Sequence, residues 1–175
     1  VGLLAAALLS LSVLNIQLAH FYTVDTFANL FIVATIYLLL RANDSGSWLD
    51  YALTGLALGL GLASKVSVLT LAAPIVLALG LGFRQRAQSG DMRAALEHTL
   101  VRLVTVFAVA ALTFRVLQPI AFNGPTFWNW SLFQPWRDDI EEQSKIVAGE
   151  MDLPWLQQWT DRPLSFALGN IVVWG

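Results

Sequence analysis

The stretch Gln17–Arg41, QLAHFYTVDTFANLFIVATIYLLLR, decides the fold because it joins two apolar runs through a short polar segment. A histidine, His20, and an aspartate, Asp25, interrupt what is otherwise almost pure hydrocarbon. Ionisable side chains at the edge of a bilayer are costly, so such a pair indicates a functional site that faces a cavity. We therefore expect a membrane protein whose chemistry lies where these two runs meet.

The composition supports a membrane protein. Hydrophobic residues make up 57% of the 175-residue chain and charged residues 13%, whereas soluble domains carry about 25% charged residues. The mean hydropathy is +0.64, and the apolar residues come in blocks. The absence of cysteine from these residues excludes disulfides and thiolate chemistry among them. We predict an all-α fold, a polytopic transmembrane helical bundle.

The apolar blocks predict about five spans, because crossing a hydrocarbon core takes about 20 residues. A Trp-rich, acidic extracytoplasmic loop with a short helix near 138–149 should follow them, and then a further span should start. Since Val1 begins directly in an apolar run, we expect an internal fragment of a longer protein. The predicted transmembrane region is 1–120, with spans near 2–19, 24–41, 48–63, 66–83 and 96–118; the loop is 121–165, and the next span starts at 166–175.

Local signals refine the span region. Gly55 and Gly59 form a GxxxG-spaced pair, which favours close contact between helices. Pro74 should kink the helix that contains it. The segment 43–47, NDSGS, is typical of a tight turn.

The distribution of arginines predicts the topology. Arg41 follows one span, and three crossings later Arg84, Arg86 and Arg93 return to the same face, which the positive-inside rule makes cytoplasmic. The opposite face then collects His20, Asp25, Lys65, Arg115 and the acidic loop. We therefore expect a multi-pass protein of the cell membrane with its site on the extracytoplasmic side.

Each polar residue on that face has two interpretations. Asp25 is either an N-cap of its span or a carboxylate that lines a substrate cavity. His20 is either an ordinary edge residue or, with Asp25, a ligand of a divalent metal ion, although two ligands do not define a metal site. Lys65 either extends its ammonium to the interface or contacts a lipid-linked phosphate. Arg115 either clamps a phosphate or pairs with an acid of the loop.

The acidic loop contains a second group of candidates, in GEMDLPWLQQWTDR at 149–162. Indoles, amides and carboxylates bind sugars, but they also form aromatic belts at membrane surfaces, and composition alone favours the belt. Because the loop is acidic, nucleic acid is not an expected partner. The candidate substrate contacts are His20, Lys65, Arg115, Gln118, Asp152, Gln158 and Trp159.

Several motifs resemble those of a known family. HFYTVDTFANLFIVATIYLLLR is similar to the segment that opens a span in the GT-C superfamily of membrane glycosyltransferases, and GLALGLGLASKVSVLTLAAPIVLAL is similar to a helix pair of the same proteins. RVLQPIAF, FNGPTFW, GEMDLP, QWTDRP and NIVVWG resemble the YYY-domain group, which is related to protein O-mannosyltransferases and aminoarabinose transferases.

The resemblance implies an enzyme that transfers a sugar from a polyprenyl-phosphate donor to an acceptor, with inversion, outside the cytoplasmic leaflet. Asp25 matches the second acidic position of the family, and the principal catalytic acid would precede Val1. Lys65 and Arg115 match basic positions used for the phosphate. Many members use a divalent metal ion and others do not. This fragment alone would then be inactive.

Two other classes of protein fit the same residues. A transporter or flippase for a lipid-linked or anionic substrate would also place Lys and Arg beside a cavity between broken helices. A membrane scaffold would use the polar residues only as caps and belts. The oligomeric state, the sugar and the acceptor leave no signal in the sequence.

Overall fold

The computed structural model describes residues 2–21, 23–88, 91–124, 126–151, 165, 166, 169 and 172. The chain forms two compact units, a four-helix unit at Thr23–Pro119 and a flanking unit made of Val1–Tyr22 and Ile120–Gly175. Helices dominate both units, and the described part of the chain contains no strand beyond one isolated bridge. The all-α prediction is therefore confirmed.

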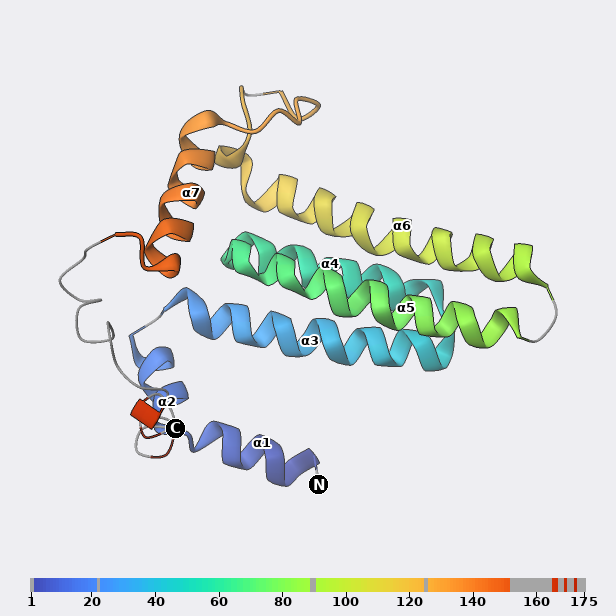
Figure 1. Cartoon of the computed structure of the whole chain (residues 1–175), viewed down its shortest axis with the longest axis horizontal. Helices are drawn as coiled ribbons and strands as arrows, with labels where there is room; N and C mark the ends of the chain where they lie inside the picture. Colours follow the sequence, from blue (N-terminus) through green and yellow to red (C-terminus); the bar gives the residue numbers. More distant parts are fainter. Residues whose placement is uncertain are drawn as a thin grey trace. The chain divides into compact units, whose positions relative to one another are not determined.

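The four-helix unit consists of antiparallel helices joined by short connections (Figure 1). α4 packs against both α3 and α6, and α5 packs mainly against α6. A short 3₁₀ segment, η1, precedes α5 directly. The elements are α3 (Val24–Ser45), α4 (Trp48–Ser64), η1 (Val66–Leu71), α5 (Ala72–Ala87) and α6 (Met92–Leu117).

Local chemistry explains where these helices end and begin. α3 ends at Gly46, whose left-handed φ of 65° suits a residue without a side chain and whose N–H bonds to the carbonyl of Ala42 at 2.9 Å. The predicted turn is thus shortened to Gly46 and Ser47. α6 begins after Asp91, whose carboxylate accepts hydrogen bonds from the N–H groups of Arg93 and Ala94 at 3.0 and 3.2 Å.

The predicted GxxxG contact is confirmed between α4 and α6. A methyl group at Gly55 would collide with the carbonyl oxygen of Val106. One at Gly59 would lie 2.5 Å from the Cβ of Thr113 and 2.7 Å from the carbonyl oxygen of Ala110. The two glycines therefore allow the helix backbones to approach more closely than any larger residue would.

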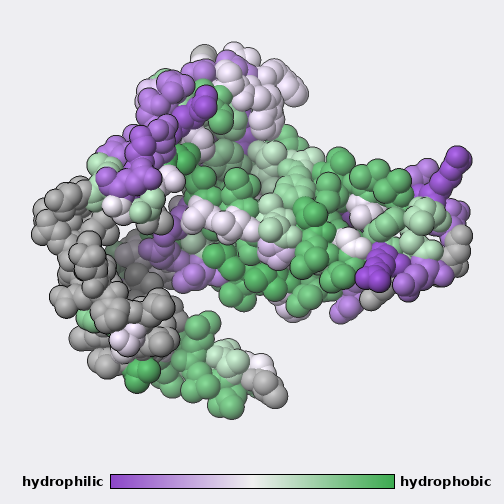
Figure 2. All heavy atoms as spheres, in the orientation of Figure 1, coloured by the Kyte–Doolittle hydropathy of each residue, from purple (hydrophilic) through white to green (hydrophobic). Residues whose placement is uncertain are grey.

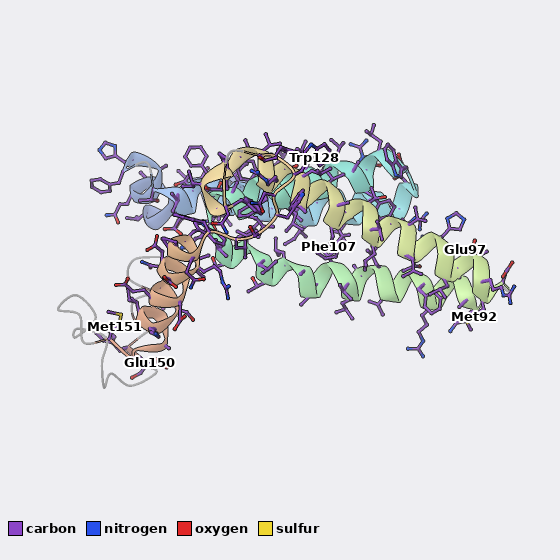
Figure 3. All side chains as sticks on the ribbon, turned by 90° about the horizontal axis from the view of Figure 1, so that it is seen from above. Met92, Glu97, Phe107, Trp128, Glu150 and Met151 are labelled. Atoms are coloured by element: carbon purple, nitrogen blue, oxygen red, sulfur yellow. The ribbon has the colours of Figure 1, made fainter. Side chains whose placement is uncertain are left out.

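The exterior of the four-helix unit is apolar. Figure 2 shows hydrophobic atoms over most of the visible bundle and hydrophilic atoms at the α5–α6 connection, where Figure 3 labels Met92 and Glu97. Within the described ranges, three helices are long and apolar enough to cross a membrane by length and composition. This pattern supports a location in the membrane. The three helices are Val24–Ser45, Val66–Arg84 and Met92–Leu117.

One local expectation differs from the structure, and a second stays untested. The apolar run at 2–19 forms two helices, α1 (Gly2–Ser10) and α2 (Val13–His20), because the chain is extended at Ser12. Pro74 lies in the first turn of α5, three residues after η1 ends, and the predicted kink at this residue stays a prediction.

The described part of the flanking unit also contains η2 (Pro119–Ala121) and α7 (Gln134–Ala148). α7 is rich in charge and ends at Gly149 in the left-handed conformation, with φ 75°. Its Glu141 and Lys145 form an ion pair of 2.8 Å one turn apart.

Candidate functional site

A break between two helical segments positions Lys65. The residue has an extended conformation, with φ −153° and ψ 120°, between α4 and η1. Its N–H still bonds to the carbonyl of Gly61 at 2.8 Å, and its carbonyl accepts from the N–H of Val68 at 3.0 Å. The backbone is therefore satisfied although the helix is interrupted, and the side chain leaves the bundle at its end.

The Lys65 ammonium forms an ion pair with the carboxylate of Asp25, 40 residues earlier in the chain. The two side chains are 46% and 39% exposed, so a ligand in solution or at a membrane surface can reach them. The capping interpretation of Asp25 is wrong, because the N-cap of α3 is Thr23 and no side chain caps the helix. Asp25 lies in the first turn, where its charge suits the helix dipole.

The last turn of α6 reaches the same end of the unit. The side-chain amide of Gln118 donates to the carbonyl oxygen of Ala63 at 3.0 Å, two residues before Lys65. Arg115 lies about one turn earlier on α6 and is buried, with 4% exposure. We call Asp25, Lys65, Arg115 and Gln118 the Lys65 end.

The remaining candidates fall outside this group. His20 belongs to the flanking unit, where its ring packs edge-on against Phe21 at 5.5 Å. Asp152, Gln158 and Trp159 lie outside the described residues. Across the residues that the structure describes, no three His, Cys, Asp or Glu side chains are close enough to hold a metal ion.

Sequence reasoning missed a second polar cluster, which we call the Asp50 corner. Asp50 is only 3% exposed; its carboxylate pairs with the Nε of Arg41 at 3.2 Å and accepts from the hydroxyl of Ser45 at 2.6 Å. The Arg102 guanidinium lies 4.9 Å from the ring centre of Tyr51. The sequence did contain a signal for the Asp50 corner: an acid in the first turn of an apolar helix, close after an arginine and a tight turn.

The model of one protein family matches the chain, at residues 1–111, and its description is dolichyl-phosphate-mannose-protein mannosyltransferase. The matched segment contains His20, Asp25 and Lys65 and ends before Arg115 and Gln118. No curated protein and no solved structure matches the chain. Since the match covers more than half of the chain and agrees with the apolar helices, the chain belongs to the dolichyl-phosphate-mannose-protein mannosyltransferase family, a family of membrane glycosyltransferases of the GT-C type.

Proposed function

We propose that this chain forms part of a multi-pass enzyme that transfers a sugar from a polyprenyl-phosphate donor to an acceptor on the extracytoplasmic side of the cell membrane. The family assignment supports the reaction class. The observation that carries the site is the accessible ion pair between Lys65 and Asp25 at the end of an apolar bundle.

The charges of the pair suit the departure of a lipid phosphate. As the bond between sugar and phosphate breaks, negative charge develops on the phosphate oxygen, and a fixed ammonium such as Lys65 stabilises that charge. Because an ammonium has three donors, Lys65 can first contact a phosphate while it is still bonded to Asp25. Arg115, in the last turn of α6, is the second positive charge proposed for the same end.

Asp25 then has a supporting role in the transfer. Its carboxylate orients the Lys65 ammonium, and when a phosphate draws that ammonium away, the carboxylate becomes free to position an acceptor hydroxyl or accept its proton. The principal catalytic acid would come from another part of the enzyme. His20 remains a proposed partner of Asp25 in metal binding, and Gln118, Asp152, Gln158 and Trp159 remain proposed sugar contacts.

The proposal also includes membership of the YYY-domain group and an extracytoplasmic position of the site. The YYY-domain resemblance rests partly on RVLQPIAF at 115–122, beyond the segment that the family model matches. What supports an extracytoplasmic site is the separation of polar groups in the four-helix unit, with Asp25, Lys65 and Gln118 at one end and Arg41 at the other. A cytoplasmic Arg41 puts the Lys65 end outside.

The test is sugar transfer by the whole enzyme in vesicles with three variants, Asp25→Asn, Lys65→Ala and Arg115→Ala. We expect Lys65→Ala to reduce the transfer rate by about 100-fold, as the loss of a charge-stabilising donor does in other enzymes. Asp44→Asn is the matched control for Asp25, because Asp44 is an exposed acid at the other end of α3. Lys145→Ala on the exposed face of α7 is the control for Lys65.

Two results would decide against the proposal. Normal transfer in all three variants, at normal expression, would remove the Lys65 end from the active site. Transmembrane movement of the lipid-linked substrate without any transfer of its sugar would favour the transporter class instead.

A further inference from the structure

The described residues 120–124 and 126–133 form a hydrogen-bonded loop, which we call the aromatic loop. An antiparallel bridge joins Phe122 to Leu132 at its base, and the Asn123 N–H bonds to the carbonyl of Ser131 at 2.9 Å. The side-chain amide of Asn123 also donates to the carbonyl of Leu132 at 3.0 Å, and the hydroxyl of Ser131 donates to Asn129 at 2.6 Å. The loop therefore has a defined shape, with its amide groups turned to internal hydrogen bonds.

This loop exposes large apolar side chains. Trp128, labelled in Figure 3, is 79% exposed, and Ile120 is 71% exposed. Phe127 packs edge-on against both Trp128 and Trp130, at 5.5 and 6.4 Å between ring centres. Contiguous exposed apolar surface of this kind marks a contact with a partner or a membrane.

The charge pattern along the chain indicates that the contact is with a membrane. Residues 116–136 contain no Asp, Glu, Lys, Arg or His, whereas α7 carries charged residues from Arg137 onward. The change is visible in Figure 2, where the aromatic loop is pale and α7 is strongly hydrophilic. An uncharged, Trp-containing segment that directly adjoins a charged one is typical of the boundary between a bilayer and water.

The aromatic loop also follows directly after a helix that can span a membrane. α6 ends at Leu117, and Phe122, at the base of the loop, is only five residues later. Five extended residues reach at most about 17 Å. Wherever α6 leaves the bilayer, the base of the loop therefore lies close to the same surface.

We propose that the aromatic loop inserts into the headgroup layer of the bilayer, with Trp128 and Trp130 among the lipids and α7 in water. Indole rings favour this layer because they combine a large apolar body with a polar N–H. Sugar stacking is the weaker interpretation, because carbohydrate recognition uses amides or carboxylates beside the rings, whereas the amide nitrogen of Asn123 and the amide oxygen of Asn129 bond within the loop. The anchor does not depend on the transfer reaction.

Site-specific fluorescence can test this insertion, because these 175 residues contain no cysteine. The variant Trp128→Cys would carry an environment-sensitive fluorophore in the whole protein, reconstituted in phosphatidylcholine vesicles. The matched control is Ser144→Cys on α7, which is exposed and lies in the charged segment. A second label at Ile120→Cys tests the loop if replacement of Trp128 disturbs it.

We expect the probe at 128 to be quenched at least about twofold more strongly than the probe at 144 by lipids with a quencher near the headgroup. Aqueous iodide should give the opposite order. Equal quenching by iodide at 120, 128 and 144, without lipid quenching, would overturn the proposal. So would a probe at 128 that only a soluble acceptor glycan shields, because the loop would then be a sugar platform.

Discussion

The two ends of the four-helix unit each hold an acid paired with a base, yet the pairs differ in access to solvent. At the Asp50 corner the side chain of the acid is 4% exposed and has two partners, Arg41 and Ser45. At the Lys65 end both members of the pair are between 39% and 46% exposed. A buried carboxylate must have its partners for the fold to persist, whereas an accessible pair can exchange one partner for a ligand. The difference separates a structural contact from a candidate site.

The largest effect on stability should come from the pair of Arg41 and Asp50, in which the acid is buried and the arginine is 56% exposed. Arg41→Met leaves the Asp50 carboxylate buried with only Ser45, and we expect a loss of about 2–4 kcal/mol in the free energy of unfolding. Denaturant titration in detergent, followed by circular dichroism, measures it. Arg93→Met, at an exposed arginine, is the control. A loss equal to that of the control would show that Asp50 does not depend on Arg41.

The second-largest effect on stability should come from the glycine contact of α4 with α6, between the two ends of the unit. Gly55→Ala forces a methyl group against the carbonyl of Val106, and such overpacking costs about 1–3 kcal/mol. Gly80→Ala is a matched control in α5, because nothing lies within 4 Å of the added methyl group. The same unfolding assay should show that Gly80→Ala leaves the free energy of unfolding unchanged or raises it. Equal effects at both glycines would mean that α4 and α6 are not in tight contact.

The exposed pair should matter less for stability than for activity. Lys65→Met should lower the free energy of unfolding by less than about 1 kcal/mol, because solvent screens accessible ion pairs. A double-mutant cycle with Asp25→Asn isolates the interaction between the two side chains. A coupling free energy as large as that between Arg41 and Asp50 would show that the pair of Asp25 and Lys65 is a structural contact, in contrast to the role assigned to it above.

The smallest effect concerns the exposed ion pair on α7, Glu141 with Lys145. The hydrogen bond and charge of Lys145 lower the pKa of Glu141, and the same hydrogen bond and charge from Glu141 raise the pKa of Lys145. The contribution of Glu141 to helix stability is therefore present above its ordinary pKa and lost as the pH falls through the lowered value. An NMR titration of the carboxyl group should show the lowered pKa in the wild type. Lys145→Gln should return it to the ordinary range, and an unchanged pKa would exclude the pair.

The fold was largely predictable because hydrocarbon blocks of span length leave few alternatives to helices. The sequence also predicted that Asp25 and Lys65 share one end of the bundle, since each lies where an apolar run stops. Their direct contact was not predictable, because it joins residues 40 positions apart through the extended backbone at Lys65. Asp50 was missed for a different reason: its partners Arg41 and Ser45 lie close before it in the chain, but its burial also depends on how α3 packs against α4.

The 3₁₀ segment η1 has a consequence for the bilayer itself. A 3₁₀ helix rises about 2.0 Å per residue against 1.5 Å for an α-helix, so the 19 residues Val66–Arg84 reach about 31 Å instead of about 28 Å. That length matches a hydrocarbon core of about 30 Å. The neighbouring α4, with 17 residues, reaches only about 25 Å. If α4 crosses as well, its shorter length favours a bilayer that thins by a few ångströms around it, and such thinning would bring a membrane-borne phosphate down to the level of Lys65.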